Sequence, residues 1–194
     1  MGLPCTLIRL SGCNLRCSYC DTLYAQSEYY FTTVGEIKDS LSKYYPKRIL
    51  ITGGEPLHQE STPYFISALL QEDYQIILET NGSLDVSMIE PDVIKIMDLK
   101  CPGSGECEHN LYKNLDYLTE KDEIKFVISD KVDFEWVTSI IKEYDLQERF
   151  EILLSPAAHR VSPSTLSEWI QRDHLDVRLQ IQLHKIIWGD KRGV

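Results

Sequence analysis

The stretch that decides the fold spans residues 9–22 and reads RLSGCNLRCSYCDT. Its cysteines, Cys13, Cys17 and Cys20, have the spacing Cys-x3-Cys-x2-Cys, and no fourth cysteine follows nearby. Cysteine thiolates hold the irons of a [4Fe–4S] cluster. Three thiolates on one loop leave one iron of such a cluster open, and an open metal position is typical of catalytic sites. The loop therefore predicts a catalytic iron–sulfur cluster.

Two other interpretations of these cysteines are weaker. Cys-x2-Cys is also half of many zinc sites, but the other cysteines, Cys5, Cys101 and Cys107, supply no second pair. A non-catalytic iron–sulfur carrier or sensor would fill the fourth iron position with a protein ligand. Such a carrier would not need the Gly-Gly-Glu-Pro run at residues 53–56, so this run favours an enzyme.

Length, composition and charge limit the classes of function. The chain has 194 residues, 43% hydrophobic and 26% charged, as expected for one soluble globular domain. Its net charge is −10, and it lacks the basic stripe that a nucleic-acid surface needs, so we predict a small-molecule substrate. No apolar run is long enough to span a membrane, and the start lacks a signal-peptide pattern. We therefore expect a cytoplasmic protein without membrane or nucleic-acid partners.

Strand and helix patterns alternate along the chain, which predicts an α/β fold with a parallel sheet. A capping box of Thr33 and Glu36 marks the start of the first helix. Strands are predicted over residues 5–10, 48–52, 75–79, 93–97, 123–128, 150–154 and 177–183, and helices over residues 33–45, 61–72, 131–144 and 162–170.

Distinctive residues directly follow the predicted strands, at residues 53–56, 80–82, 98–100 and 155–156. The carboxyl ends of the strands form the active face of a parallel barrel, so we expect these segments to meet there. Two glycines at 53–56 let the backbone approach a ligand closely, and the carboxylate that follows is suited to face an ammonium group.

The spacing of Cys13, Cys17 and Cys20 is the signature of radical S-adenosylmethionine (SAM) enzymes, and the chain resembles that superfamily. The resemblance implies a partial (β/α)6 barrel, open on one side, with residues 1–194 as a single radical SAM domain. It implies that SAM chelates the open iron and is cleaved to a 5′-deoxyadenosyl radical. Residues 53–56 resemble the superfamily's motif for the SAM amino group.

A narrower resemblance is to the 7-carboxy-7-deazaguanine synthases. It rests on residues 9–22, on DLKCPGSG at 98–105, and on QLHK at 182–185 followed by WG at 188–189. It implies a carbon–nitrogen lyase that converts 6-carboxy-5,6,7,8-tetrahydropterin into 7-carboxy-7-deazaguanine, on the way to queuosine and other 7-deazapurines. SAM is regenerated in each turnover of this family, and Mg²⁺ assists.

The resemblance assigns metal-binding roles to four residues. Cys13, Cys17 and Cys20 match the [4Fe–4S] ligands, and Thr22 matches the Mg²⁺ ligand. A threonine hydroxyl is a hard oxygen of the type that Mg²⁺ takes beside waters and substrate oxygens. Read alone, Asp21 and Thr22 are also consistent with a turn or a helix cap.

The resemblance also assigns contacts with the substrate and with SAM. Arg9, Thr52 and the terminal carboxylate of Val194 match substrate contacts, and the Arg9 guanidinium is suited to pair with the pterin carboxylate in bidentate fashion. SAM contacts are expected at Tyr19, Cys20, Asp21, Gly54, Asp98, Leu99, Lys100, Leu154, Ser155, Pro156 and Ala157.

For Glu79 and His184 the sequence leaves two roles open. Glu79, at the end of a predicted strand, is suited either to hydrogen-bond SAM or to cap the turn at residues 81–82. His184 is suited either to donate to the substrate or cluster, or to a structural role.

The chain differs from the family pattern at its start. Family members usually carry a strand and a Gln-Gly-Glu-Gly stretch before the arginine strand, whereas Met1 lies only eight residues before Arg9. That stretch supplies substrate contacts. We therefore expect intact SAM and cluster sites, with weaker pterin binding.

The expected partners are the pterin and an external one-electron reductant such as flavodoxin. The sequence does not determine the oligomeric state, and a homodimer is compatible with it. The alternative function is that of another small radical SAM enzyme, such as a glycyl-radical activase, whose partner would be a protein. The Cys-Asp-Thr triplet at residues 20–22 and the tail at 182–185 argue against that alternative.

Overall fold

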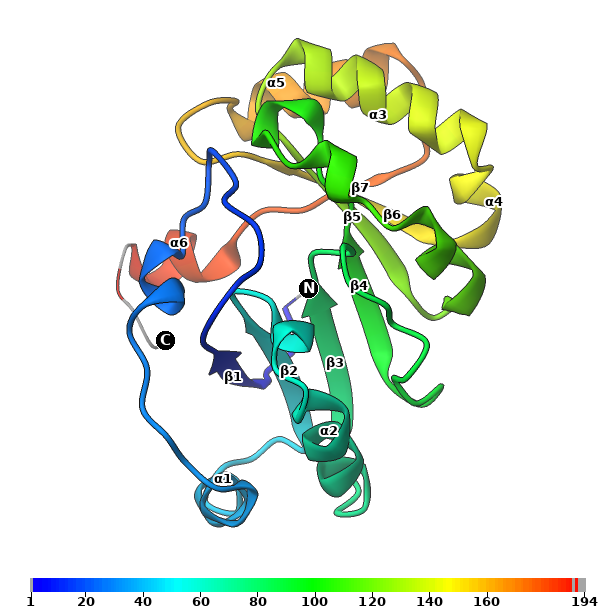
Figure 1. The fold of residues 1–194 in the computed structure, drawn as a ribbon. Coiled ribbons are helices and arrows are strands. Elements are labelled where there is room, and N and C mark those ends of the chain that lie inside the picture. Colours follow the sequence, from blue (N-terminus) through cyan, green and yellow to red (C-terminus); the bar gives the residue numbers. More distant parts are fainter. Residues whose placement is uncertain (1, 190, 192–194) are drawn as a thin grey trace.

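Seven parallel strands form one curved sheet in the computed structural model, which describes residues 2–189 and 191 (Figure 1). Each strand pairs with the next in sequence, and within the described residues no pairing joins the first strand to the last. The expected open, parallel α/β barrel is confirmed, and all seven predicted strands are present, the last of them shorter than predicted. The strands are β1 (Thr6–Leu10), β2 (Arg48–Gly53), β3 (Gln75–Thr80), β4 (Ile94–Asp98), β5 (Glu123–Ile128), β6 (Glu151–Pro156) and β7 (Arg178–Leu179).

Helices cover the convex face of the sheet, with α1 and α2 outside the first strands and α3 to α5 outside the last (Figure 1). The predicted capping box is present, because Glu36 N donates to Thr33 Oγ1 and Thr33 N donates to Glu36 Oε2. No helix within residues 2–189 has both the length and the apolar character needed to cross a membrane. The helices are α1 (Val34–Leu41), α2 (Thr62–Leu70), α3 (Lys131–Glu143), α4 (Leu146–Arg149), α5 (Pro163–Arg172) and α6 (Leu183–Trp188).

Alternate strand residues separate a dry convex face from a concave face. Ile49, Ile51, Ile76, Leu78 and Phe126 are fully buried where the strands pack on the helices. Because successive side chains of a strand point to opposite faces, the residues between them point to the concave side. The polar members of that concave set near the carboxyl ends are Arg9, Thr52, Glu79, Asp98 and Lys125, which the strand register brings into neighbouring rows.

The end of the chain differs from the sequence expectation. The strand predicted over residues 177–183 is reduced to β7, and α6 begins at Leu183. Apolar alternation there fits an edge strand, but the chain leaves the sheet after Gln180 N donates to Leu154 O at 2.8 Å. The β3–β4 and β4–β5 connections contain no α-helix; the second is built from the 3-10 turns η3 (Pro102–Ser104), η4 (Cys107–His109) and η5 (Tyr112–Tyr117).

Candidate active site

The cysteine loop leaves β1 at the carboxyl edge of the sheet and is anchored on two sides. On one side, Gly54 N donates to Leu10 O at 3.1 Å and Glu55 N donates to Gly12 O at 2.8 Å. On the other side, Ser18 N donates to Ser104 O at 2.9 Å, and Arg16 N donates to Glu106 Oε1 at 2.7 Å. The loop is therefore held between the end of β2 and the segment after β4, as the predicted active face requires.

Cys13, Cys17 and Cys20 are free, partly buried thiols on this loop. Burial raises the pKa of Cys17, and the nearby Lys100 ammonium lowers it only in part. A buried thiol of this kind becomes a thiolate when a metal takes the place of its proton. Among the described residues, no three Cys, His, Asp or Glu side chains converge on a single ion. Each thiolate of a [4Fe–4S] cluster binds its own iron, so the cluster does not require that convergence.

The two glycines of the Gly-Gly-Glu-Pro run let β2 close against the cysteine loop. A Cβ atom on Gly54 would lie 2.1 Å from Gly12 O and 2.7 Å from Cys13 Cβ, and one on Gly53 would lie 1.9 Å from Leu10 O. These distances are far below contact distance. The close backbone approach that the sequence predicts is therefore made, at least in part, to the chain's own cluster loop.

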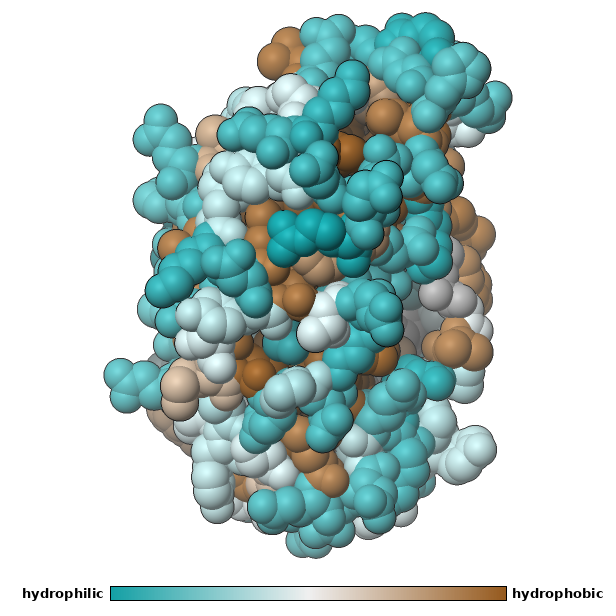
Figure 2. Space-filling view, turned by 90° about the vertical axis from the view of Figure 1, so that its right-hand side faces the viewer, coloured by the Kyte–Doolittle hydropathy of each residue, from teal (hydrophilic) through white to brown (hydrophobic). Residues whose placement is uncertain are grey.

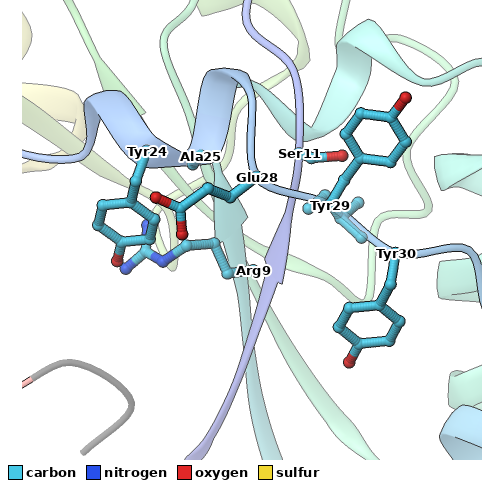
Figure 3. Close-up of a pocket in the computed structure, with 8 residues that line it drawn as sticks. Arg9, Ser11, Tyr24, Ala25, Glu28, Tyr29 and Tyr30 are labelled. Carbon is cyan, nitrogen blue, oxygen red and sulfur yellow. The ribbon is translucent and has the colours of Figure 1, made fainter.

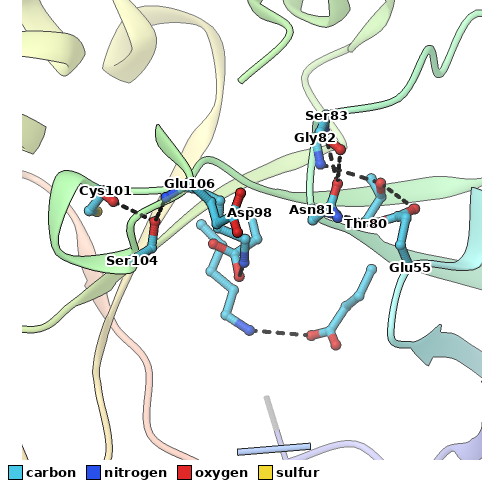
Figure 4. Close-up of polar contacts among 12 residues, drawn as sticks. Glu55, Thr80, Asn81, Gly82, Ser83, Asp98, Cys101, Ser104 and Glu106 are labelled. Carbon is cyan, nitrogen blue, oxygen red and sulfur yellow. Dashed lines mark hydrogen bonds and ion pairs between the residues drawn. The ribbon is translucent and has the colours of Figure 1, made fainter. Parts of the chain in front are cut away.

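The Glu55 carboxylate is fully buried and binds the chain itself (Figure 4). It accepts hydrogen bonds from Leu57 N at 2.9 Å, from Thr80 Oγ1 at 2.8 Å and from Asn81 N at 2.6 Å. Burial raises its pKa, while these donors lower it in part. The sequence predicted that this carboxylate faces an ammonium group. In the structure it instead connects the end of β2 to the end of β3 through its hydrogen bonds with Thr80 and Asn81.

Asn81 extends this connection to the cluster loop, a role that the sequence did not indicate. Its Nδ2 donates to Asn14 Oδ1 at 3.0 Å, and Asn14 Nδ2 donates to Ser83 Oγ at 2.8 Å. The turn cap at residues 81–82 comes from Asn81 Oδ1, which accepts from Ser83 N, and not from Glu79. No local spacing could reveal this network, because Asn14 and Asn81 are far apart in the sequence.

Charged and polar groups form a row across the concave face. Thr52 Oγ1 donates to Glu79 Oε2 at 3.1 Å, and Lys125 Nζ lies 3.7 Å from Glu79 Oε1. The Glu79 carboxylate raises the pKa of Lys125. Farther along the row, Lys100 Nζ donates to Asp98 Oδ2 at 2.8 Å. Thr52, expected to contact substrate, thus lies beside the Glu79 carboxylate, whose other oxygen is near the Lys125 ammonium.

A pocket of about 400 Å³ opens beside β1, next to the start of the cluster loop. Arg9 Nη1 donates to Gly53 O at 3.3 Å, and its guanidinium carbon lies 5.9 Å from the centre of the Tyr24 ring. Figure 3 shows Arg9, Tyr24 and Glu28 gathered on one side of β1, with Tyr29 and Tyr30 on the other. The pocket is lined by Arg9, Leu10, Ser11, Tyr24, Ala25, Glu28, Tyr29 and Tyr30.

Comparisons with known proteins agree with this geometry. The model of the radical SAM superfamily matches residues 7–144. Two curated 7-carboxy-7-deazaguanine synthases, from Koribacter versatilis and Chlorobaculum tepidum, are each 39% identical to the chain, over all of this chain and over 92% and 90% of theirs. The chain belongs to the 7-carboxy-7-deazaguanine synthase family of radical SAM proteins.

A solved structure supports the fold of this synthase family member independently. The crystal structure of Streptococcus suis SuiB bound to the precursor peptide SuiA superposes with a TM-score of 0.63, at 12% sequence identity. The match covers 94% of this chain, which spans about half of the SuiB chain, 50%. At this identity the likeness concerns the fold alone.

The synthase family implies a [4Fe–4S] cluster and SAM, and two buried polar atoms beside the cluster loop fit that requirement. Tyr19 Oη and Asp98 Oδ1 have no hydrogen-bond partner among the described residues. Burial raises the pKa of the Tyr19 hydroxyl, and the Asp98 carboxylate adds to this effect. A buried polar atom without a partner is costly, so a polar ligand that satisfies both atoms would be stabilised here.

Among the other residues expected to contact SAM, some have a polar side chain near the cluster loop and others have only backbone atoms to offer. The Lys100 ammonium lies beside Asp98; burial lowers its pKa, but the Asp98 carboxylate and the Cys17 thiol raise it on balance. Leu99 and Leu154 have fully buried side chains that pack in the core, and the Leu154 carbonyl is bonded to Gln180. These two leucines therefore have only backbone atoms to offer to a polar ligand.

The rest of the 154–157 segment lies at the carboxyl end of β6. Ser155 is buried on the concave side, Pro156 ends the strand, and Ala157 N donates to Ile128 O at 2.8 Å. The segment therefore reaches the same edge as the cluster loop, as predicted from the strand ends.

The tail of this synthase family member returns to the cluster loop. Asp21 Oδ2 accepts hydrogen bonds from Gln182 Nε2 and Lys185 Nζ, both at 2.9 Å, and Asp21 Oδ1 accepts from Thr22 Oγ1 at 2.9 Å. Burial raises the pKa of Asp21, but these donors outweigh it and hold the pKa well below its usual range. His184 is exposed on the first turn of α6, and Val194 lies outside the described residues.

Proposed function

We propose that the chain catalyses the reaction of its family, the conversion of 6-carboxy-5,6,7,8-tetrahydropterin into 7-carboxy-7-deazaguanine with loss of ammonia. The observation that carries the proposal is the position of the three-cysteine loop at the carboxyl edge of an open parallel barrel, next to a pocket that contains Arg9. The identity of 39% to synthases over the whole chain supports the same reaction.

The residues around the loop fit the two groups that the family requires. Cys13, Cys17 and Cys20 would hold the cluster. Tyr19 and Asp98 would use their unpaired buried atoms on SAM, and the other assigned positions would contribute backbone or polar contacts. When bound, the cluster and SAM supply the radical that starts the ring contraction. The protein orients these groups and keeps water out. The full set proposed for SAM is Tyr19, Cys20, Asp21, Gly54, Asp98, Leu99, Lys100, Leu154, Ser155, Pro156 and Ala157.

The pocket beside β1 fits a flat, charged heterocycle. The Arg9 guanidinium has five N–H groups, of which one on Nη1 donates to Gly53 O, so others remain to pair with a carboxylate. Tyr24 supplies an aromatic face next to it. Thr52 and its partner Glu79 lie one and two strands away, where they would contact the heterocycle's polar edge. Thr22 would hold Mg²⁺ through its hydroxyl, and the Val194 carboxylate would complete the substrate contacts.

The finer partner assignments belong to this proposal as well. Radical SAM chemistry needs one electron from outside the chain, and we assign that role to flavodoxin. We place the protein in a reducing cytoplasm, because a [4Fe–4S] cluster with an open iron is sensitive to oxygen. The proposed oligomeric state is a homodimer.

Equilibrium binding without turnover tests the substrate assignment. Anaerobic, cluster-loaded protein with SAM and Mg²⁺ but no reductant is titrated with 6-carboxytetrahydropterin and, as a matched control, with tetrahydropterin that lacks the carboxylate. The carboxylated compound should bind about ten- to a hundredfold more tightly, the worth of one charge-assisted contact. Binding of neither pterin, or equal binding of both, would contradict the proposal.

A further inference from the structure

The C-terminal segment reaches the cluster loop without a core of its own. After Gln180 leaves the sheet, α6 contributes no buried residue, and Ile186, Ile187 and Trp188 are 68%, 57% and 50% exposed. Figure 1 shows α6 beside the short 3-10 helix η1 (Leu23–Gln26) that follows the cluster loop, away from the helices that cover the sheet. Specific polar contacts, rather than apolar packing, therefore fix where this segment lies.

Those contacts converge on a single carboxylate. Gln182 Nε2 and Lys185 Nζ both donate to the same oxygen of Asp21, at 2.9 Å. The side chains of Lys185 and Asp21 are 32% and 38% exposed, so this ion pair is partly shielded from water. The contacts connect residues more than 160 positions apart and hold the tail against the cluster loop.

The second oxygen of Asp21 acts on the neighbouring hydroxyl. Thr22 Oγ1 donates its hydrogen to Asp21 Oδ1 at 2.9 Å. A hydroxyl has one hydrogen and two lone pairs, so donation to Asp21 fixes its rotation and leaves both lone pairs for another group. A hard cation such as Mg²⁺ binds oxygen lone pairs, and carboxylates behind a metal ligand orient that ligand and tune its affinity.

We propose that Gln182 and Lys185 are positioning residues for the cation site. By clamping Asp21 they set the direction of the Thr22 hydroxyl, and they thereby couple placement of the C-terminal segment to binding of the divalent cation. This inference rests on the proposed function, in which Thr22 is the Mg²⁺ ligand. It adds a second group of residues, contributed by the tail, on which metal affinity depends.

Titration with Mn²⁺, a spectroscopic substitute for Mg²⁺, tests the inference without turnover. Cluster-loaded, oxidised protein with SAM and 6-carboxytetrahydropterin is titrated anaerobically, and free Mn²⁺ is measured by electron paramagnetic resonance. Lys185→Met and Gln182→Ala should each weaken Mn²⁺ binding, and together they should weaken it by about ten- to a hundredfold, the usual effect of losing an outer-shell partner. Lys185→Arg, which keeps a donor and its charge, should restore most of the affinity.

The control is Lys38→Met, which removes a lysine that pairs with Glu72 at the same distance, 2.9 Å, away from the site. It should leave Mn²⁺ affinity unchanged. Wild-type affinity in the Lys185→Met and Gln182→Ala double variant would overturn the inference, as would the absence of saturable Mn²⁺ binding in the wild type. Product formation by the wild type is scored separately, so that the inference can fail while the proposed function stands.

Discussion

At the scale of single residues, most polar groups near the carboxyl ends of the strands on the concave face already have partners within the chain. Thr52 is bonded to Glu79, and Lys100 to Asp98, before any ligand is considered. Tyr19 Oη and Asp98 Oδ1, by contrast, are buried and lack a hydrogen-bond partner among the described residues. Substitutions at paired residues therefore disturb a network, whereas substitutions at ligand-facing groups should change one binding constant.

Arg9→Gln should separate substrate binding from SAM binding. The change removes the guanidinium charge but keeps a polar side chain, and one lost charge-assisted contact is worth about 1.5–3 kcal/mol. The apparent KM for the pterin should rise by roughly ten- to a hundredfold, with SAM affinity unchanged. Arg172→Gln, at an exposed arginine paired with Asp173, is the matched control. A wild-type pterin KM in the Arg9 variant would show that this arginine does not contact the substrate.

Thr22→Val should remove the stimulation by Mg²⁺ while SAM still binds. Valine has nearly the same shape as threonine but lacks the oxygen that a hard cation needs. Activity is measured against Mg²⁺ concentration, and SAM binding is measured by equilibrium dialysis. Thr22→Ser, which keeps the hydroxyl, should retain the metal dependence. Unchanged Mg²⁺ dependence in the valine variant would mean that the Thr22 hydroxyl only hydrogen-bonds to Asp21 and does not bind the metal.

At the scale of elements, the Gly-Gly-Glu-Pro run joins β2, β3 and the cluster loop. Gly54 allows the backbone of β2 to touch the loop at Gly12, and the Glu55 carboxylate collects three donors, including the Thr80 hydroxyl at the end of β3. The geometry of the cluster loop therefore depends on residues about forty positions away from it.

Gly54→Ala should impair cluster assembly more than stability. Its Cβ would lie 2.1 Å from Gly12 O, so the loop carrying Cys13 must shift. Iron and sulfide per chain after anaerobic reconstitution should fall well below the wild-type values. Gly35→Ala in α1 is the control, because its nearest contact would be Thr33 Oγ1 at 3.9 Å. Full iron loading in the Gly54 variant would show that the close approach is not required.

Glu55→Gln should lower the free energy of unfolding of the metal-free protein. The amide nitrogen that replaces one carboxylate oxygen faces N–H or O–H donors, and each buried donor left without an acceptor costs about 1–3 kcal/mol. Urea unfolding measures the loss. Glu72→Gln, at an exposed position in the turn after α2, should stay within about 0.5 kcal/mol of the wild type. Equal stability of the two variants would argue against the internal role of Glu55.

At the scale of the whole molecule, the sequence predicted the features that short stretches of the chain encode by themselves. The cysteine spacing at residues 9–22 predicted the cluster loop, and apolar strand runs followed by special residues predicted the active edge of the open sheet. The roles of Glu55 and Asp21 were not predictable in the same way. Their partners are a distant backbone N–H and two tail side chains, which only the folded chain brings together.

The end of the chain shows a second limit of local pattern. Alternating apolar residues over 177–183 fit a strand, but among the described residues β7 pairs only with β6, and it ends after two residues. The polar contacts of Gln182 and Lys185 with Asp21 then direct the chain into α6. Periodicity describes which faces are apolar, and it does not record such long-range polar contacts.

The central claim is that the chain carries out the ring contraction of its family. Reconstituted protein is incubated anaerobically with 6-carboxytetrahydropterin, SAM, Mg²⁺ and dithionite, beside a Cys17→Ala control, and the products are identified by mass spectrometry. The account predicts 7-carboxy-7-deazaguanine in excess over both protein and consumed SAM, with none from the control. Cleavage of SAM to 5′-deoxyadenosine while the pterin remains unchanged would contradict it.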